Sequence, residues 1–218
     1  MPAAAQALQG VGQVKAMDIS HYQGNVDWSA VKGDGVKVAY LKASEGKDYV
    51  DGTYAKNRAA AAAQGIVTGA YDFAKPGSTS PGDVVADAKA EAAHFLKTAG
   101  VKKGDLAPAL DLEDAGKLNK AQLAQWVKTW GETVKAATGT TPTLYTSPSF
   151  WNSKVGSADA ATGFKLWIAH WGVASPTVPA GWQSWAGWQT GSSGAIAGIN
   201  GRVDTDVMKD PASMLVGA

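Results

Sequence analysis

The feature that most restricts the fold of this chain is a repeated alternation of strand-like and helix-like segments that changes late in the sequence. Short apolar runs predict strands at 15–19, 36–43, 66–73, 106–112, 143–146, 164–169, 185–189 and 202–207. Helices are expected at 27–31, 54–64, 83–98 and 119–137. Asp27 and the pair Asn119 and Gln122 are typical helix N-terminal caps, and Gly65 and Gly100 follow helix ends. Five βα units followed by strands without clear long helices predict a TIM-like α/β barrel.

The length and composition favour one globular domain. The 218 residues are 45% hydrophobic, which is enough to bury the core of a single domain. We expect residues 1–14 to be a flexible N-terminal tail, because the opening residues lack the basic and apolar regions of an intact signal peptide. Residues 15–218 then form a single domain.

Charge and composition also exclude several classes of function. A net charge of +1 without a basic run gives no electrostatic basis for binding nucleic acid. No run of about 18 apolar residues is present, so we expect no membrane span. The chain has no cysteine, which excludes disulfides, zinc–thiolate sites and thiol catalysis. Three scattered histidines do not form a metal-binding set, and we expect no metal and no cofactor.

The segment from Ala107 to Asp114 carries the clearest chemical signal. It is an apolar run that ends in two acids, Asp111 and Glu113, separated by one residue. In a β-strand this spacing places both side chains on one face, and Leu112 points the other way. Two acids on one face repel each other, but hydrolysis of a glycosidic bond uses such a pair. The spacing therefore indicates a glycoside hydrolase, although the motif alone is common.

Acids and aromatic residues recur at other expected strand ends, where barrel enzymes place their catalytic side chains. The residues expected at this rim are Asp18, Glu45, Asp72, Asp111, Glu113, Tyr145, Trp167, His170, Trp188, Asp204 and Asp206. Some have a plain structural alternative: Glu45 is equally compatible with a surface turn, and Asp206 is expected to be a solvated loop acid. The aromatic rings of Tyr71, Tyr145, Trp167 and Trp188 suit sugar binding or barrel filling, and we expect about half to reach a groove.

The chain resembles glycoside hydrolase family 25, the Chalaropsis-type lysozymes. The matching stretches are 17–24 (MDISHYQG), 27–28 (DW), 41–46 (LKASEG), 69–73 (GAYDF), 110–113 (LDLE), 144–146 (LYT), 166–171 (LWIAHW), 187–189 (GWQ) and 201–204 (GRVD). They follow the order and spacing of the family. The resemblance implies a (β/α)5(β)3 barrel that hydrolyses the β-1,4 bond between N-acetylmuramic acid and N-acetylglucosamine.

The resemblance also implies roles for individual residues. Glu113 would be the general acid and Asp111 its partner carboxylate, while Asp18 and Asp204 would complete the acidic site. We expect substrate contacts from Tyr71, Asp72, Tyr145, Trp167, Trp188 and Glu45. The partner would be bacterial peptidoglycan, and the protein a monomer that is secreted or encoded by a phage.

Two positions depart from the usual family pattern. Asp72 stands where many members have histidine, and Thr190 where they often have tyrosine. An inward Asp72 would raise the pKa of Glu113, because a nearby like charge disfavours ionisation. Alternatively, Asp72 pairs with Lys42 or Lys75. We expect Thr190 to remove an aromatic wall or a hydroxyl from one sugar subsite.

Three classes of function remain open: a muramidase, an inactive barrel that binds peptidoglycan, and another amino-sugar hydrolase such as a chitinase. The intact set of four acids argues against a pure binder. The route also stays open, because the i, i+2 spacing fits a covalent intermediate, inversion, or attack by the 2-acetamido group of the substrate. We favour the last route, with Asp111 orienting the acetamido group.

Overall fold

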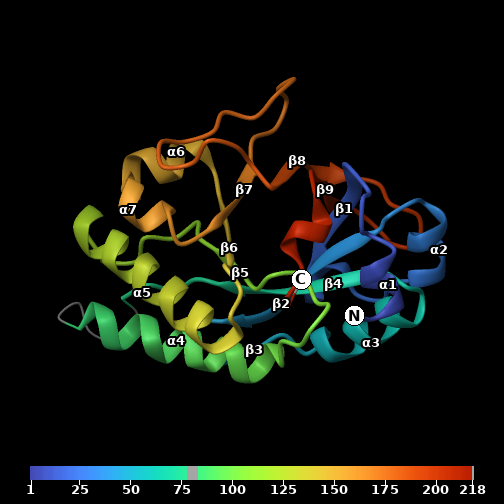
Figure 1. The fold of residues 1–218 in the computed structure, drawn as a ribbon, viewed down its shortest axis with the longest axis horizontal. Helices are drawn as coiled ribbons and strands as arrows, with labels where there is room; N and C mark the ends of the chain where they lie inside the picture. Colours follow the sequence, from blue (N-terminus) through green and yellow to red (C-terminus); the bar gives the residue numbers. More distant parts are fainter. Residues whose placement is uncertain (78–82, 218) are drawn as a thin grey trace.

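The computed structural model describes residues 1–77 and 83–217, and its central feature is a closed barrel of eight strands (Figure 1). In chain order these are β1 (Val14–Ile19), β2 (Val38–Glu45), β4 (Val67–Phe73), β5 (Ala109–Asp111), β6 (Thr143–Thr146), β7 (Lys165–Ala169), β8 (Gly187–Gly194) and β9 (Val203–Met208). Strand β1 pairs with both β2 and β9, which closes the barrel. The two-residue β3 (Tyr49–Val50) adds to β2 outside it.

Helices cover only part of the barrel, as the sequence predicts. The four principal helices are α2 (Trp28–Gly33), α3 (Tyr54–Ala63), α4 (Val84–Ala99) and α5 (Lys120–Thr138). After β6 the chain forms α6 (Pro148–Phe150), a π-helical turn at Trp151–Val155 and α7 (Ala158–Ala161). In the described residues no α-helix follows β7, β8 or β9. This arrangement confirms the TIM-like barrel of five βα units and three further strands.

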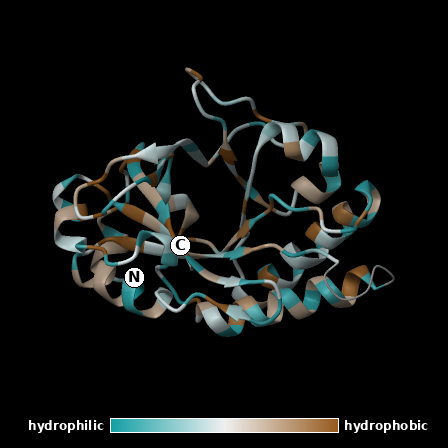
Figure 2. Ribbon diagram, turned by 180° about the vertical axis from the view of Figure 1, so that it is seen from behind, coloured by the Kyte–Doolittle hydropathy of each residue, from teal (hydrophilic) through white to brown (hydrophobic). Residues whose placement is uncertain are grey.

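The predicted helix caps are present. The Asp27 carboxylate accepts hydrogen bonds from the Ser29 and Ala30 amides, and Asn119 and Gln122 form a capping box at the start of α5. Helices α4 and α5 lie side by side along one side of the barrel (Figure 1). Hydrophilic and hydrophobic residues alternate along them, as expected for helices with one face on the sheet (Figure 2). None of the helices within 1–77 and 83–217 has the length and hydrophobicity needed to cross a bilayer.

Strand β9 runs antiparallel to both of its neighbours, whereas β1, β2 and β4–β8 run parallel. The reversal brings the beginning of β9 to the edge where the parallel strands end. Asp204, the second residue of β9, consequently lies opposite Asp18 near the end of β1. An acid from the start of one strand and an acid from the end of another thus share the same rim.

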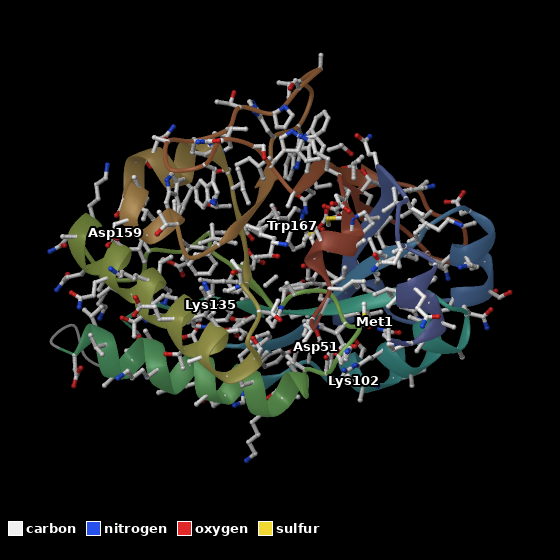
Figure 3. The ribbon with its side chains drawn as sticks, viewed as in Figure 1. Met1, Asp51, Lys102, Lys135, Asp159 and Trp167 are labelled. Carbon is white, nitrogen blue, oxygen red and sulfur yellow. The ribbon has the colours of Figure 1, made fainter. Side chains whose placement is uncertain are left out.

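The barrel interior is filled by aromatic rings. The Tyr40 and Trp167 rings stack with centroids 4.7 Å apart, and the Tyr145 ring meets Trp167 edge-on at 4.7 Å. Trp167 lies inside the barrel in Figure 3. A Cβ atom at Gly69 would lie 2.4 Å from Tyr40 Cε1, so this position has room only for glycine. The aromatic filling forms a rigid floor beneath the strand ends.

The first residues of the chain pack against the barrel, which differs from the flexible tail expected for 1–14. Helix α1 (Ala3–Gln6) places Ala5 in the inner apolar core, together with Leu8. Met214 and Leu215 join them from the end of the chain. These side chains cover the end of the barrel opposite the acids, where the apolar interior would otherwise face water.

Candidate active site

The C-terminal ends of the parallel strands surround a pocket of about 180 Å³. Its lining residues are Asp18, Ile19, Ser20, Tyr22, Gln23, Lys42, Tyr71, Phe73, Asp111, Glu113, Tyr145, Trp167, Gln189 and Asp204. The structure therefore brings together the four acids that the sequence singled out, with three of the four aromatic residues expected to bind substrate.

Asp111 and Glu113 form the centre of this pocket. Strand alternation holds as predicted, because Leu110 and Leu112 point into the outer core while both acids face the pocket. The two carboxyls hydrogen bond to each other, with Asp111 buried and Glu113 exposed. Burial and the neighbouring Glu113 raise the pKa of Asp111, partial desolvation in the pocket raises that of Glu113, and the Lys42 ammonium opposes both shifts. Asp111 Oδ1 is buried and meets no donor among the described residues, which disfavours the ionised form of Asp111.

A second group of acids lies beside this pair. Burial and the neighbouring acids Asp206 and Asp204 raise the pKa of Asp18 well above its usual value. The expectation that Asp206 is a solvated loop acid is wrong. Its side chain is buried in the barrel and accepts a hydrogen bond from Trp167 Nε1 at 2.7 Å. Burial raises the pKa of Asp206 to about 7.

The Asp206 pKa predicts a pH-dependent stability. Its folded-state pKa lies above its ordinary value of 3.8, so the contribution of the neutral acid to stability is fully present below about pH 4. That contribution is lost as the pH rises towards 7. We expect the free energy of unfolding, measured by urea denaturation, to fall over this range in the wild type and to fall less in Asp206→Asn. Equal slopes in both proteins would contradict the assignment.

Gln189 connects the acids to the aromatic wall, a role that we did not predict. Its Nε2 donates to Asp18 Oδ2 at 2.8 Å, and its Oε1 accepts hydrogen bonds from Tyr145 Oη at 2.8 Å and Trp171 Nε1 at 3.0 Å. The side chain is buried, so these contacts fix the orientation of Asp18. A signal for this residue was available, since Gln189 belongs to the 187–189 (GWQ) stretch that carries the family resemblance.

Asp72 does not face the pocket, contrary to its expected role in substrate binding. It follows the inward-facing Tyr71 on β4, so its side chain points outward to the helices. Its carboxyl accepts hydrogen bonds from Ser44 Oγ at 2.7 Å and Trp130 Nε1 at 3.2 Å. It forms neither of the lysine pairs considered from the sequence. Burial and the nearby Glu91 raise its pKa. The two buried hydrogen bonds indicate a structural role for this acid.

Replacing Asp72 should therefore affect stability and leave catalysis unchanged. In Asp72→Ala the buried donors of Ser44 and Trp130 lose their acceptor, and we expect a loss of roughly 1–3 kcal/mol in the free energy of unfolding. Asp72→Asn keeps an acceptor oxygen and should lose less. Both variants, assayed as folded protein, should keep wild-type kcat within about twofold. A large loss of kcat in Asp72→Asn would restore the substrate-binding role.

Three other expected contacts also differ. Glu45 is not among the described residues that line the pocket; it accepts a hydrogen bond from Lys42 Nζ at 2.6 Å and holds this lysine beside the acids. The Trp188 indole is turned towards the His170 carbonyl, to which it donates at 2.8 Å. Thr190 Oγ1 donates a hydrogen bond to the Thr205 carbonyl oxygen at 3.0 Å. It is not among the described residues that line the pocket, so the structure does not show the expected change in a sugar subsite.

A groove continues from the pocket and widens the site. It has a volume of about 520 Å³ and is lined by Glu113, Tyr145, Ser147, Pro148, Ser149, Phe150, Ala169, His170 and Trp171. Trp171 in this groove is 51% exposed, and Tyr22 at the pocket mouth is 82% exposed. Both exposed rings were missed as individual contacts, although each lies within a stretch that carries the family resemblance.

Comparisons with known proteins agree with this geometry. Residues 17–199 match the family model described as "Glycosyl hydrolases family 25". Lysozyme M1 of Streptomyces globisporus is 34% identical, in a match covering 99% of this chain and 72% of that protein. The N,O-diacetylmuramidase of Chalaropsis is 32% identical, over 88% of this chain and 96% of that enzyme. The crystal structure of the bacterial lysozyme from Streptomyces coelicolor superposes with a TM-score of 0.84 at 33% identity, covering 93% of this chain and 95% of that one.

Proposed function

Because this chain belongs to glycosyl hydrolase family 25 and is therefore a glycoside hydrolase, we propose that it is a muramidase of bacterial peptidoglycan. The bond cut is the β-1,4 linkage between N-acetylmuramic acid and N-acetylglucosamine. The observation that carries this proposal is the contact between the Asp111 and Glu113 carboxyls at the end of β5. The lysozyme and muramidase names of the relatives support the choice of substrate.

Glu113 serves as the general acid in the proposed mechanism. It is the exposed member of the pair, so a glycosidic oxygen in the groove can approach it. The raised pKa keeps the shared proton available at a pH where an ordinary glutamate is ionised. Once the leaving group has departed, the Glu113 carboxylate accepts a proton from the incoming water.

Asp111 stabilises the positive charge that develops at the anomeric carbon, directly or through the 2-acetamido group. The hydrogen bond between the two carboxyls places them closer together than the about 6.5–9.5 Å that inverting enzymes keep for a water. The contact therefore favours net retention. We propose the substrate-assisted route, in which Asp111 orients the acetamido group. Net inversion in the products would rule out this route and the covalent one.

The remaining residues hold this machinery in place. Asp18 and Asp204 place carboxyl oxygens on the opposite wall, where they can accept hydrogen bonds from the substrate. The four acids line a single pocket within this barrel, so we propose that a monomer is sufficient for hydrolysis. Since the substrate lies outside the cell membrane, we also propose that the enzyme acts extracellularly, as a secreted protein or a phage lysin.

A substrate panel separates the proposal from its alternatives. We expect the wild type to clear a suspension of purified bacterial cell wall and to leave chitin intact. Clearing of chitin at a similar rate would favour a chitinase. Co-sedimentation with cell wall without release of fragments, in a folded protein, would favour a binding module.

A further inference from the structure

A separate groove of about 580 Å³ lies at the opposite ends of β7 and β8 from the catalytic pocket. Two tryptophans and two lysines dominate its lining: Trp182, Trp185, Lys165 and Lys209. No described residue lines both this groove and the catalytic pocket or its extension. We call it the Trp185 groove.

The tryptophans of this groove are held firmly yet remain partly exposed. Trp182 Nε1 donates to the Phe164 carbonyl at 2.9 Å, and its ring packs on Trp151 with centroids 4.5 Å apart. The Trp185 ring meets Trp188 edge-on at 6.0 Å. Both groove rings are half-buried. A ring with a fixed orientation and an open portion binds another flat apolar surface at a low entropic cost.

The groove exists because the layer of helices around the barrel is incomplete. No α-helix follows β7 or β8 in the described part of the chain, and the connection between these strands extends outward as a loop (Figure 1). Residues 181–186 of this connection supply six of the fourteen lining residues, and the rest come from 161–166 before and at the start of β7 and from 209–213 after β9. In a TIM barrel with all eight helices, a helix would occupy this outer surface.

The charges of the groove favour an acidic ligand. Lys209 Nζ lies over one face of the Trp185 ring, 4.2 Å from its centre, so a cation stands at the aromatic surface and leaves the other face for a ligand. Lys165 adds a second ammonium, which also donates to the Ser213 carbonyl, against the single carboxylate of Asp210. Gln183 and Ser184 supply exposed polar groups for hydrogen bonds. Apolar ring faces, cations and amide groups together match a sugar polymer that carries carboxylates.

We propose that the Trp185 groove is a second binding site for the peptidoglycan strand, separate from the site of cleavage. Sugar rings stack on Trp185 and Trp182, while Lys209 and Lys165 pair with carboxylates of the muramic acid and peptide substituents. This inference rests on the proposed substrate. Attachment at a second site raises the effective concentration of the insoluble polymer near the pocket. It adds affinity for the intact wall and contributes nothing to cleavage of a short soluble fragment.

Binding to wall sacculi measures the groove independently of catalysis. In the inactive Glu113→Gln background, we expect Trp185→Ala and Lys209→Glu each to raise the Kd for sedimented sacculi by roughly tenfold. Trp185→Phe should retain most of the affinity. The matched control is Lys89→Glu, a charge reversal on the exposed face of α4. Thermal unfolding confirms that each variant is folded. If Trp185→Ala does not fold, Lys209→Glu alone still tests the groove.

The second measurement uses active enzymes on soluble wall fragments of two disaccharides. We expect kcat/KM for Trp185→Ala and Lys209→Glu to equal that of the wild type. Unchanged Kd values for sacculi in both folded variants would overturn the inference, as would an equal loss on soluble fragments. If the wild type binds sacculi through Trp185 but releases no fragments, the second site stands and the proposed muramidase activity fails.

Discussion

Glu113→Gln is expected to lower kcat for hydrolysis of cell-wall glycan by about 10²–10⁴-fold, the usual contribution of a general acid. Glutamine has nearly the same shape and keeps the polar contact with Asp111, but it has no acidic proton to transfer to the leaving oxygen. The affinity for the wall should change little, because the groove and its aromatic residues remain. The measurement is the initial rate of fragment release at saturating substrate, together with binding to sacculi.

The matched control is Glu132→Gln, which makes the same chemical change on the exposed surface of α5. It should have wild-type kcat. A Glu113→Gln enzyme with more than a tenth of the wild-type rate would show that another group delivers the proton.

Asp111→Asn is expected to lower kcat by about 10²–10³-fold, with a smaller change in KM. Asparagine fills the same space at the end of β5, but it cannot carry the negative charge that stabilises the cationic transition state. The loss should therefore appear in the chemical step. Single-turnover hydrolysis measures this step without product release.

Asp114→Asn is the control for this second prediction. Asp114 is a rim acid three residues further along, and its carboxylate lies 3.6 Å from Lys75 Nζ, outside the pocket lining. Its replacement should leave kcat within about twofold. If both asparagine variants lost activity equally, overall negative charge would explain the result and a specific role of Asp111 would not.

The two-residue periodicity of strands explains why the acid pair could be predicted from the sequence and why the role expected for Asp72 was wrong. The same period-two rule that placed Asp111 and Glu113 together also separates adjacent residues. Tyr71 and Asp72 are neighbours on β4, so only one of them can face the pocket. Assigning both to substrate binding followed the family pattern over the local geometry.

Other features depended on the direction and pairing of strands, which local sequence does not determine. The antiparallel course of β9 brings Asp204 opposite Asp18 and places Asp206 deeper in the barrel. Likewise, the burial of Ala5 depends on an open barrel end that forms only when the strands close. Such contacts join residues nearly two hundred positions apart and arise from tertiary packing.

The identity of the new reducing ends tests the central claim most directly. Purified peptidoglycan is digested with the wild-type enzyme, the products are reduced with borohydride, and the terminal residues are identified by mass spectrometry. The proposed muramidase predicts reduced N-acetylmuramic acid at the new ends, absent from a Glu113→Gln digest. New ends that carry reduced N-acetylglucosamine would contradict the account, because the enzyme would then cut the other glycosidic bond of the polymer.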